Sequence, residues 1–482
     1  MWLPETVHLS TWFLFLVIIV YFAIIIISVT VVLRENRNPI RALSWVIALI
    51  FLPGVGLIFY LFFGRSLRGE MLSQKNRRRL QHSFQPYGVK LQETTLSKEQ
   101  KNLVMLGSQV CGYPLTYNNE VKILTNGKDK FESLKVDLKT SIKFIYLQYY
   151  IFLDDKIGTE ISEILKEKAR EGVEVKVIYD HVGSFSARNK FFKSMRDQGI
   201  EVRPFFRVNF PQLANRINWR NHRKIVVIDG KIGYIGGMNI ADRYAYGEEK
   251  KEKEQWRDTH FRVKGDIVES LLHSFLVDWN FGEKEPYFPK LQPRIENINN
   301  LKGIQLVTGG PINTWDNLSL MFLKAITSAK RLIWIQTPYF LPTDALYNAL
   351  QAAALSNIDV RIMMPAHTDS LLLHYASFSY ITQCLNAGIK IYLYQPGMLH
   401  AKAMIIDDNL VTAGSTNFDF RSFENNFECN LFIHDPELNS RMRDIFYEDM
   451  KDCTKLQKEK WKKRPLGHRF LESLLRLVSP IL

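Results

Sequence analysis

One five-residue pattern, His-x-Lys-x4-Asp-x6-Gly-x2-Asn, occurs twice in the chain. It lies within NHRKIVVIDGKIGYIGGMN at 221–239 and again within LHAKAMIIDDNLVTAGSTN at 399–417, 178 residues later. A single His-x-Lys pair is usually an ordinary surface pair. Five residue types at one spacing in both copies are difficult to explain by packing, so the pattern predicts two equivalent halves with a shared chemical role.

The segments around the two patterns also repeat. TSIKFIYLQYYIF at 140–152 resembles TSAKRLIWIQTPYF at 327–340, EVKVIYD resembles DVRIMMP, and QGIEVRPF resembles AGIKIYLY, with offsets of 185 to 189 residues. Helical patterns such as GTEISEILKEKAREG lie between these strand-like runs. Strands that alternate with helices, twice over, predict an α/β fold with two similar domains, over residues 118–295 and 303–455.

Each pattern is typical of a β-hairpin that carries its histidine and lysine on one face. KIVVID and KIGYIGG are apolar, β-branched runs joined by a polar turn, as are KAMIID and NLVTAGS. His222 and Lys224 are two residues apart and therefore point to the same side of a strand. His400 and Lys402 have the same relationship, so each hairpin presents an imidazole and an ammonium group together.

Two-residue turns at 230–231 and 408–409 would set the register of both hairpins. Asp229 and Asp407 then fall at the turns, on the opposite face of the strand from the histidine and lysine. We therefore expect them to orient or brace the hairpins rather than touch a substrate. The same register adds amide and hydroxyl groups to each cluster. The predicted facing pairs are Asn239 with His222, Asn417 with His400, and Ser415 with Lys402.

Such a cluster suits a phosphodiester substrate. Lysine ammonium groups neutralise the non-bridging oxygens, and amide or hydroxyl donors stabilise charge that develops in the transition state. One histidine can attack phosphorus to form a covalent intermediate, while the other exchanges protons with the leaving and incoming alcohols. Because this chemistry needs no cluster of metal ligands, the sequence predicts catalysis without a metal or other cofactor.

The amino-terminal segment distinguishes between two kinds of anionic partner. The formal net charge of +14 suits either nucleic acid or an acidic membrane surface. Residues 11–33 contain no charge and would form a helix ~35 Å long, enough for a ~30 Å hydrocarbon core. The basic start of a secretory signal is missing. The segment therefore predicts a retained transmembrane anchor and argues against a nucleic-acid partner.

A second apolar run covers residues 42–63 and is interrupted at Pro53-Gly54, which favours a kink or a re-entrant turn. Basic residues stand on both sides of this run. Because arginine and lysine favour the cytoplasmic face, a re-entrant run would leave both basic segments, and the domains that follow, on that side. Residues 1–69 are thus predicted as a membrane anchor and 70–117 as a polar, partly helical linker.

At the duplicated pattern the chain resembles the phospholipase D superfamily, whose signature is this HKD motif. The resemblance covers residues from about 118 to 455. It implies an α/β sandwich in each half, one active site at a pseudo-two-fold joint, and a phosphohistidine intermediate. The six motif positions of the superfamily match His222, Lys224, Asp229, His400, Lys402 and Asp407.

Within the superfamily the chain is similar to the bacterial cardiolipin synthases. The segments that carry this resemblance are NPIRALSWVIALIFLPGVGLIFYLFFGR, EQWRDTHFRVKG and NFDFRSFENNFECN. The resemblance implies transfer of a phosphatidyl group from one phosphatidylglycerol to another, which gives cardiolipin and glycerol. The family also places a carboxylate behind each catalytic histidine. Asp258 and Glu428 are the candidates for these two carboxylates, because each follows its motif and neither stands in a run of charged residues. The alternative is that each forms an ordinary structural ion pair.

The expected mechanism has His222 as the nucleophile and His400 as the proton donor to glycerol, although the near-symmetry of the halves also permits the reverse. Other functions remain open. A hydrolytic phospholipase D would use water in place of the second lipid, and an inactive membrane scaffold would bind lipid only. A nuclease of the same superfamily fits a tethered chain less well.

Two further segments suggest contact with a membrane surface. The segment at 203–221 mixes aromatic and arginine side chains, which suits either a lipid headgroup interface or a packed loop. Residues 456–482 are expected to form a basic amphipathic helix that lies on the membrane or covers a core face. The four cysteines have no zinc or disulfide spacing and are expected to be free thiols.

Overall fold

The structure is a computed structural model of the 482-residue chain. The amino-terminal helices form one compact unit, and residues 69–207 and 219–482 form another. The described residues are 11–35, 39–60, 88–89, 91–208, 218–247, 256–281, 287, 298 and 302–479.

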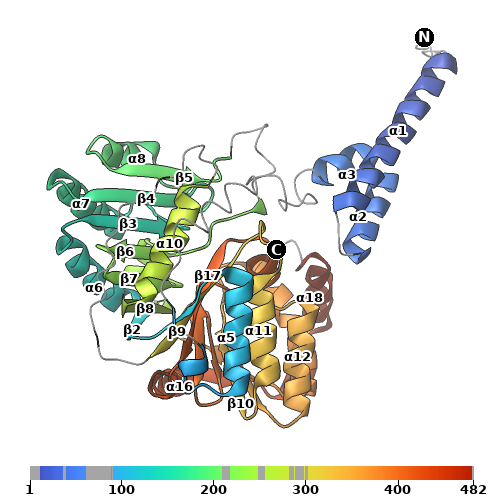
Figure 1. Ribbon diagram of the computed structural model, residues 1–482. Helices are drawn as coiled ribbons and strands as arrows, with labels where there is room; N and C mark the ends of the chain where they lie inside the picture. The colour runs from blue at the N-terminus through green and yellow to red at the C-terminus, as the bar shows by residue number, and fades with distance from the viewer. Residues whose placement is uncertain are drawn as a thin grey trace. The chain divides into compact units, whose positions relative to one another are not determined.

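The first half of the large unit is a seven-stranded sheet in the order β2-β8-β7-β6-β3-β4-β5. Strands β3, β4 and β5 are parallel and the other neighbours are antiparallel. Helices α6 and α7 lie on one side of this sheet and α10 on the other (Figure 1). The strands are β2 (Asn119–Asn126), β3 (Phe144–Tyr149), β4 (Glu174–Asp180), β5 (Glu201–Phe205), β6 (Ile225–Ile228), β7 (Ile232–Gly236) and β8 (Arg257–Gly265). The helices are α6 (Gly127–Lys139), α7 (Lys156–Arg170), α8 (Asn189–Arg196), α9 (Asp242–Ala245) and α10 (Ile267–Trp279).

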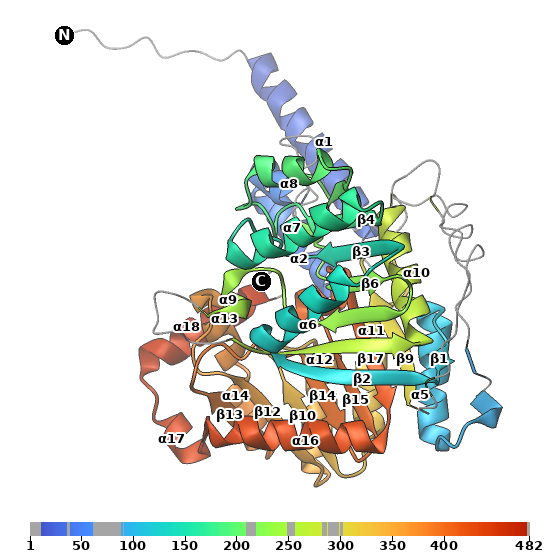
Figure 2. The ribbon, with the colours of Figure 1, turned by 90° about the vertical axis from the view of Figure 1, so that its left-hand side faces the viewer.

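The second half repeats this arrangement in the order β9-β17-β15-β14-β10-β12-β13, with β1 and β18 added at the two edges. Figure 2 shows α16 on one side of the strands and α11 and α12 on the other. The strands are β1 (Leu115–Thr116), β9 (Gly303–Gly309), β10 (Leu332–Gln336), β12 (Asp359–Pro365), β13 (Lys390–Tyr394), β14 (Ala403–Ile406), β15 (Leu410–Gly414), β17 (Glu428–His434) and β18 (Cys453–Lys455). The longer helices are α5 (Lys98–Cys111), α11 (Asn317–Ser328), α12 (Asp344–Leu355), α13 (Leu371–Phe378) and α16 (Pro436–Lys451). The short elements are η2 (Leu91–Glu93), β11 (Phe340–Leu341), α14 (Ile381–Asn386), β16 (Phe418–Asp419) and α15 (Phe420–Glu424).

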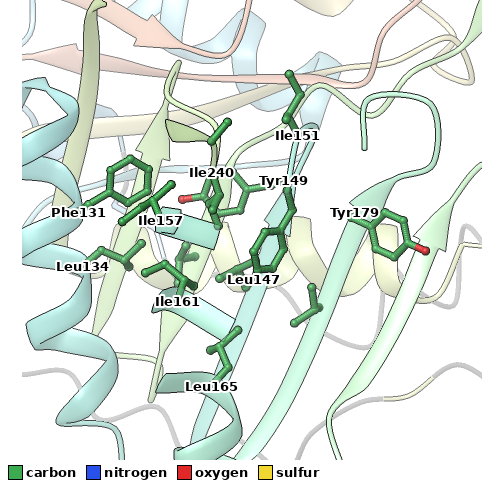
Figure 3. Close-up of a cluster of buried hydrophobic side chains, with 14 of the residues drawn as sticks. Phe131, Leu134, Leu147, Tyr149, Ile151, Ile157, Ile161, Leu165, Tyr179 and Ile240 are labelled. Atoms are coloured by element: carbon green, nitrogen blue, oxygen red, sulfur yellow. The ribbon is translucent and has the colours of Figure 1, made fainter. Parts of the chain in front are cut away.

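A mixed α/β fold with two repeated domains is therefore confirmed. The strand runs that predicted the repeat become β3 with β10, β4 with β12, and β5 with β13, in matching positions of the two sheets. Each domain has its own core. In the first, apolar side chains of α6, α7 and the central strands interdigitate, among them Phe131, Leu147 and Ile161 (Figure 3).

The predicted register of both hairpins is wrong by one residue. Ile228 pairs with Ile232 and Ile406 pairs with Leu410, so the loops are three residues long, at 229–231 and 407–409. Asp229 and Asp407 open these loops with positive φ angles of 54° and 49°. Aspartate tolerates this left-handed conformation better than most residues. The extra loop residue shifts every facing pair that the two-residue turn predicted.

Part of the predicted linker at 70–117 belongs to the second domain. Helix α5 buries Leu103 and Val104 against that domain, and Gln305 of β9 donates to the carbonyl of Val104 (3.0 Å). Strand β1 pairs with β9 at the sheet edge. Residues 98–116 are thus a structural part of the sheet-and-helix layer, because their apolar side chains complete its core.

The carboxyl-terminal segment forms two helices rather than one, α17 (Lys458–Lys462) and α18 (Leu466–Val478). The aromatic side chains at both ends of the segment at 203–221 are buried, including Phe205, Phe206 and Trp219, which supports the packed-loop interpretation for them. Residues 209–217 lie outside the described residues. The four cysteines are free, as expected.

The amino-terminal unit contains α1 (Thr11–Glu35), α2 (Pro39–Phe51) and α3 (Pro53–Phe59). The second apolar run turns back on itself, since the rings of Trp45 and Tyr60 meet at 5.4 Å although fifteen residues separate them. The hydroxyl of Tyr21 donates to the carbonyl of Ile50 (3.1 Å), which ties α1 to α2. Among the residues that the structure describes, none of the helices has both the length and the apolar character required to cross a membrane. The transmembrane span at 11–33 therefore stays a prediction.

Candidate active site

His222 lies just before β6 and is held by the second half of the chain. Its peptide N–H donates to the carbonyl of Phe427 (2.9 Å), and the next residue, Glu428, places its carboxylate behind the imidazole. Nδ1 of His222 lies 2.9 and 3.0 Å from the two carboxylate oxygens of Glu428. The ring of Tyr150 packs edge-on at 4.9 Å. These contacts fix the ring orientation and leave Nε2 without a hydrogen bond among the described residues.

His400 occupies the equivalent position before β14 and is held by the first half. Its N–H donates to the carbonyl of Arg257 (2.6 Å), and Nδ1 lies 2.7 Å from Oδ2 of the following residue, Asp258. The rings of Trp256 and Tyr244 pack against the imidazole at 5.2 and 5.4 Å. The pseudo-two-fold relationship thus extends to the backbone hydrogen bond, the carboxylate and the aromatic contacts.

The structure brings both predicted carboxylates to the histidines, but in a crossed arrangement. Asp258 follows the first motif and supports the histidine of the second, whereas Glu428 follows the second motif and supports that of the first. Sequence order alone suggests the opposite pairing. The crossing arises because each carboxylate strand begins beside the other half, at the isolated bridges of Asn221 with Phe427 and Arg257 with Leu399.

The two motif lysines lie buried beside the histidines. Nζ of Lys224 donates to the carbonyl of His222 (2.6 Å). Nζ of Lys402 donates to the carbonyl of His400 and lies 2.8 Å from its Nδ1. Burial lowers the pKa of Lys224 to about 7 and that of Lys402 to about 8. Burial disfavours the charged ammonium form, and the nearby carboxylates of Glu428 and Asp258 oppose this lowering of the pKa.

The groups of the two halves influence one another directly. Burial lowers the pKa of both histidines, most strongly for His400, and Lys402 contributes to the lowering at His222. His222 and Lys224 in turn contribute to the lowering at His400. Two imidazoles and two amines therefore share a single buried cluster, as one phosphate group at the joint requires. A bound phosphate anion would stabilise the protonated forms of all four groups.

The carboxylates show how the two histidines differ. Burial raises the pKa of Asp258 to about 6. Burial also tends to raise the pKa of Glu428, but the interactions with His222 and Lys224 outweigh this effect and lower that pKa. Nδ1 of His222 is within hydrogen-bond distance of the Glu428 carboxylate, and a neutral imidazole that donates there keeps its lone pair on Nε2, where it can attack a substrate.

Asp229 and Asp407 are engaged at the hairpin loops. The carboxylate of Asp229 accepts from the peptide N–H groups of residues 142, 143 and 144, at 2.8–2.9 Å. Asp407 accepts in the same way from residues 330, 331 and 332, at 2.7–3.1 Å. No hydrogen bond within the described residues joins either carboxylate to an imidazole. Their placement agrees with a bracing role, since each ties a hairpin loop to the start of the central strand.

The predicted amide and hydroxyl donors take different places. Asn239 donates to Tyr244 Oη (2.7 Å) and accepts from the N–H of Ile151 (3.2 Å), so it braces the ring that packs on His400. Oδ1 of Asn417 is buried and has no hydrogen-bond partner in the part of the chain described. Asn417 thus keeps a free acceptor in the second half.

Ser415 does not face Lys402, because of the register shift. Its hydroxyl instead donates to the carboxylate of Glu428 and accepts from the N–H of Cys429 (3.0 Å). The matching position in the first half is Gly237, where a β carbon would collide with the carboxylate of Asp258. The serine positions one carboxylate, and the glycine makes room for the other.

Two buried arginines complete the site and were missed from the sequence. Arg223 donates to the main-chain carbonyl of Glu428 (3.1 Å) and is neutralised by Asp278 (2.7 Å). Arg257 donates to the main-chain carbonyl of Asp258 and forms two bonds with Asp449 of α16, at 2.9 and 2.8 Å. Each guanidinium thus fixes the backbone of a carboxylate behind a histidine. Neither arginine stands in a recognisable spacing, so no sequence signal indicated this role.

Comparisons with known proteins agree with this geometry. A family model described as "Cardiolipin synthase, PLD-like domain" matches residues 134–254 and 322–450. A second model, described as "Phospholipase_D-nuclease N-terminal", matches residues 16–65. The chain is 40% identical to cardiolipin synthase 2 of Bacillus anthracis over 458 residues, which is 94% of this chain and 89% of the relative. The chain belongs to the cardiolipin synthase family of the phospholipase D superfamily.

Other members of the cardiolipin synthase family are similarly close. The major cardiolipin synthase ClsA of Bacillus subtilis (strain 168) is 38% identical over 470 residues, 95% of this chain and 97% of that protein. Among solved structures, phosphatidylserine synthase of Haemophilus influenzae Rd KW20 superimposes with a TM-score of 0.62 at 15% identity, and the match covers 79% of this chain and 100% of that one. At this identity the likeness supports the two-domain fold alone.

Proposed function

We propose that the protein is a cardiolipin synthase, which transfers a phosphatidyl group from one phosphatidylglycerol to a second and releases glycerol. The relatives that cover nearly the whole chain carry this name. The observation that carries the proposal is the crossed pair His222–Glu428 and His400–Asp258 around one buried cluster of amines. Two oriented imidazoles on one phosphate give a nucleophile and a separate proton donor, which double displacement at phosphorus needs.

In the first step Nε2 of His222 attacks phosphorus of the first phosphatidylglycerol. The bond from phosphorus to the glycerol oxygen breaks, and His400 gives that oxygen a proton from Nε2. Glu428 holds Nδ1–H of His222, so the positive charge that forms on the imidazole is stabilised by a carboxylate. Lys224 and Lys402 balance the charge on the phosphoryl oxygens.

In the second step a glycerol hydroxyl of the second phosphatidylglycerol loses its proton to His400 and attacks the phosphatidyl-histidine. The bond from phosphorus to Nε2 of His222 breaks, and cardiolipin leaves. Because each step inverts phosphorus, the reaction retains configuration. We propose His222 as the nucleophile and His400 as the group that exchanges protons; each imidazole has its Nδ1 against a carboxylate.

The amino-terminal helices are proposed to anchor the enzyme in the bacterial cell membrane as a multi-pass segment, with the catalytic domains on the cytoplasmic side. The apolar side chains of α1 are exposed, among them Phe15, Ile19 and Ile27 at 57, 62 and 64%. The fold-back of α2 and α3 suits a re-entrant second run. Cysteine labelling at positions 37 and 78 tests this topology, and labels on opposite faces would contradict it.

One assay separates the possible functions. The purified protein is incubated with phosphatidylglycerol in mixed micelles and the lipid products are resolved. Cardiolipin with an equal amount of glycerol supports the synthase. Phosphatidate supports a hydrolase, and lipid binding without a product supports an inactive scaffold.

The nucleophile is assigned by trapping the covalent intermediate. Radiolabelled phosphatidylglycerol should label His400→Ala protein and leave His222→Ala protein unlabelled, and the opposite result would reverse the roles.

A further inference from the structure

Helix α18 carries a row of apolar side chains that points away from the protein. Leu466, Phe470, Leu474 and Leu477 are 77, 72, 50 and 78% exposed. Their spacing of four, four and three residues places them along one face of the helix. Large apolar side chains grouped in this way are unusual on a surface that only water covers.

The opposite face of α18 is anchored to the second domain. Leu475 packs on the apolar core of that domain. Glu472 is buried and pairs with Arg464 (2.6 Å), and the guanidinium of Arg476 lies 4.6 Å from the ring centre of Tyr380. The helix is therefore a fixed part of the fold, and its outward row results from the fold rather than from a detached tail.

Helix α13 extends the apolar row toward the catalytic cluster. α13 and α18 lie side by side (Figure 2), and the rings of Tyr375 and His468 meet at 5.7 Å. At the start of α13, Leu371 and Leu372 are 75 and 53% exposed. We call the outward side chains of both helices the α13–α18 surface. Its residues are Leu371, Leu372, Leu466, Phe470, Leu474 and Leu477.

This surface lies next to the active site. Asp369, two residues before Leu371, accepts a hydrogen bond from Tyr339 Oη (2.5 Å). The charge of Asp369 also acts on His400, where it opposes the lowering of the imidazole pKa. Leu373 of α13 packs against the cores of both domains, so the start of the helix is at the domain joint. The start of α13 therefore lies at the domain joint that also contains His400.

Exposed basic side chains lie in the segment before α18 and on α18 itself. The two acidic side chains of residues 456–482 are both paired, Glu459 with Lys462 (3.5 Å) and Glu472 with Arg464. An exposed apolar row in a segment rich in exposed cations complements a bilayer of anionic phospholipids, whose acyl chains lie below negative headgroups. The exposed cations on and before α18 are Lys455, Lys458, Lys460, Lys462, Lys463 and Arg469.

We propose that the α13–α18 surface seats on an anionic phospholipid bilayer and passes phosphatidylglycerol from it to His400. The proposal builds on the proposed function, because it assigns the route by which that substrate enters. The occupant is the bilayer surface itself. The amino-terminal helices hold the chain near the membrane, whereas this surface brings the catalytic domains into contact with it.

The test compares bilayer substrate with monomeric substrate in the full-length enzyme. One variant combines Phe470→Ser, Leu474→Ser and Leu477→Ser. A matched control combines Met105→Ser, Val136→Ser and Leu355→Ser, whose side chains are 50, 62 and 70% exposed elsewhere on the domains. We expect the α18 variant to lose about tenfold in rate on phosphatidylglycerol vesicles, as loss of interfacial apolar contact predicts. Its rate on dihexanoyl phosphatidylglycerol below the micellar concentration should stay within about twofold of the parent. The control should match the parent on both substrates.

Three outcomes would overturn the proposal: an equal loss on both substrates, no loss on either, or a change in oligomeric mass of the α18 variant in detergent. The last would identify a second copy as the occupant.

An activity-independent measurement keeps the proposal separate from the proposed function. A fluorophore on Leu477→Cys, with Cys111 and Cys453 changed to serine, should be quenched by brominated acyl chains in vesicles rich in phosphatidylglycerol. Quenching without any cardiolipin would retain the surface and reject the synthase; absence of quenching would reject the surface.

Discussion

His400 Nδ1 lies 2.7 Å from Oδ2 of Asp258, a carboxylate that the other half of the chain supplies. The reciprocal contact joins His222 to Glu428. Neither half therefore contains a complete histidine–carboxylate pair. The duplicated domains must dock before either imidazole is oriented.

The carboxylate pairs can be tested by isosteric amides. We expect Asp258→Asn and Glu428→Gln each to lower kcat by on the order of 10²–10³-fold with little change in KM, because an amide no longer fixes the imidazole tautomer or stabilises its positive charge. The measurement is steady-state cardiolipin formation, with thermal unfolding to verify the fold. Glu459→Gln, on the surface, is the control. Wild-type kcat in either site variant would contradict the assigned roles.

The lysine pKa values predict weaker substrate binding at alkaline pH. Lys224 and Lys402, with pKa values of about 7 and about 8, lose their protons as pH rises through those values, so fewer cations face the phosphate. KM for phosphatidylglycerol should rise by up to about tenfold per lysine for each pH unit above the pKa. Lys402→Arg, which stays charged, should give a lower rate with a shallower pH dependence of KM. A flat KM profile from pH 7 to 10 in the parent enzyme would exclude this explanation.

Asp229 should matter for stability more than for the chemical step. Asp229→Asn removes one carboxylate oxygen that accepts peptide N–H groups at the hairpin loop, so we expect a loss of about 1–3 kcal/mol in the free energy of unfolding. The remaining folded protein should retain phosphohistidine formation. Asp408→Asn is a matched control, because Asp408 is an exposed neighbour of the equivalent Asp407 and forms surface ion pairs. A fully stable variant that forms no intermediate would instead place Asp229 in the chemistry.

Asp449 is predicted to position the His400 pair through Arg257. Asp449→Asn leaves the guanidinium of Arg257 without its charge partner, so the backbone that carries Asp258 loses a constraint. We expect about a tenfold lower kcat, a KM within about twofold, and a shift of the pH profile of kcat. Glu448→Gln on the same helix is the control, because Glu448 is exposed and pairs with exposed Lys451. A change in stability with an unmoved pH profile would show a purely structural role.

The local sequence predicted much of the fold. Alternating apolar runs and helical periods placed β3, β4 and α7 and their counterparts in the second half, because side-chain periodicity along a strand or helix is a local property. The lysine and histidine of each motif were likewise correctly placed together, since residues two apart on a strand share a face. The loop length failed, because a one-residue difference depends on the left-handed conformation of Asp229 and Asp407.

What the sequence by itself determined was the identity of the chemical groups and the existence of two matching domains. Only the tertiary structure decided how those groups are paired: Glu428 with His222, Asp258 with His400, and the arginines behind both. The physical reason is that these contacts join residues far apart in the chain, across a joint between two sheets. Spacing along the chain carries no information about such a joint; packing of the two domains creates it.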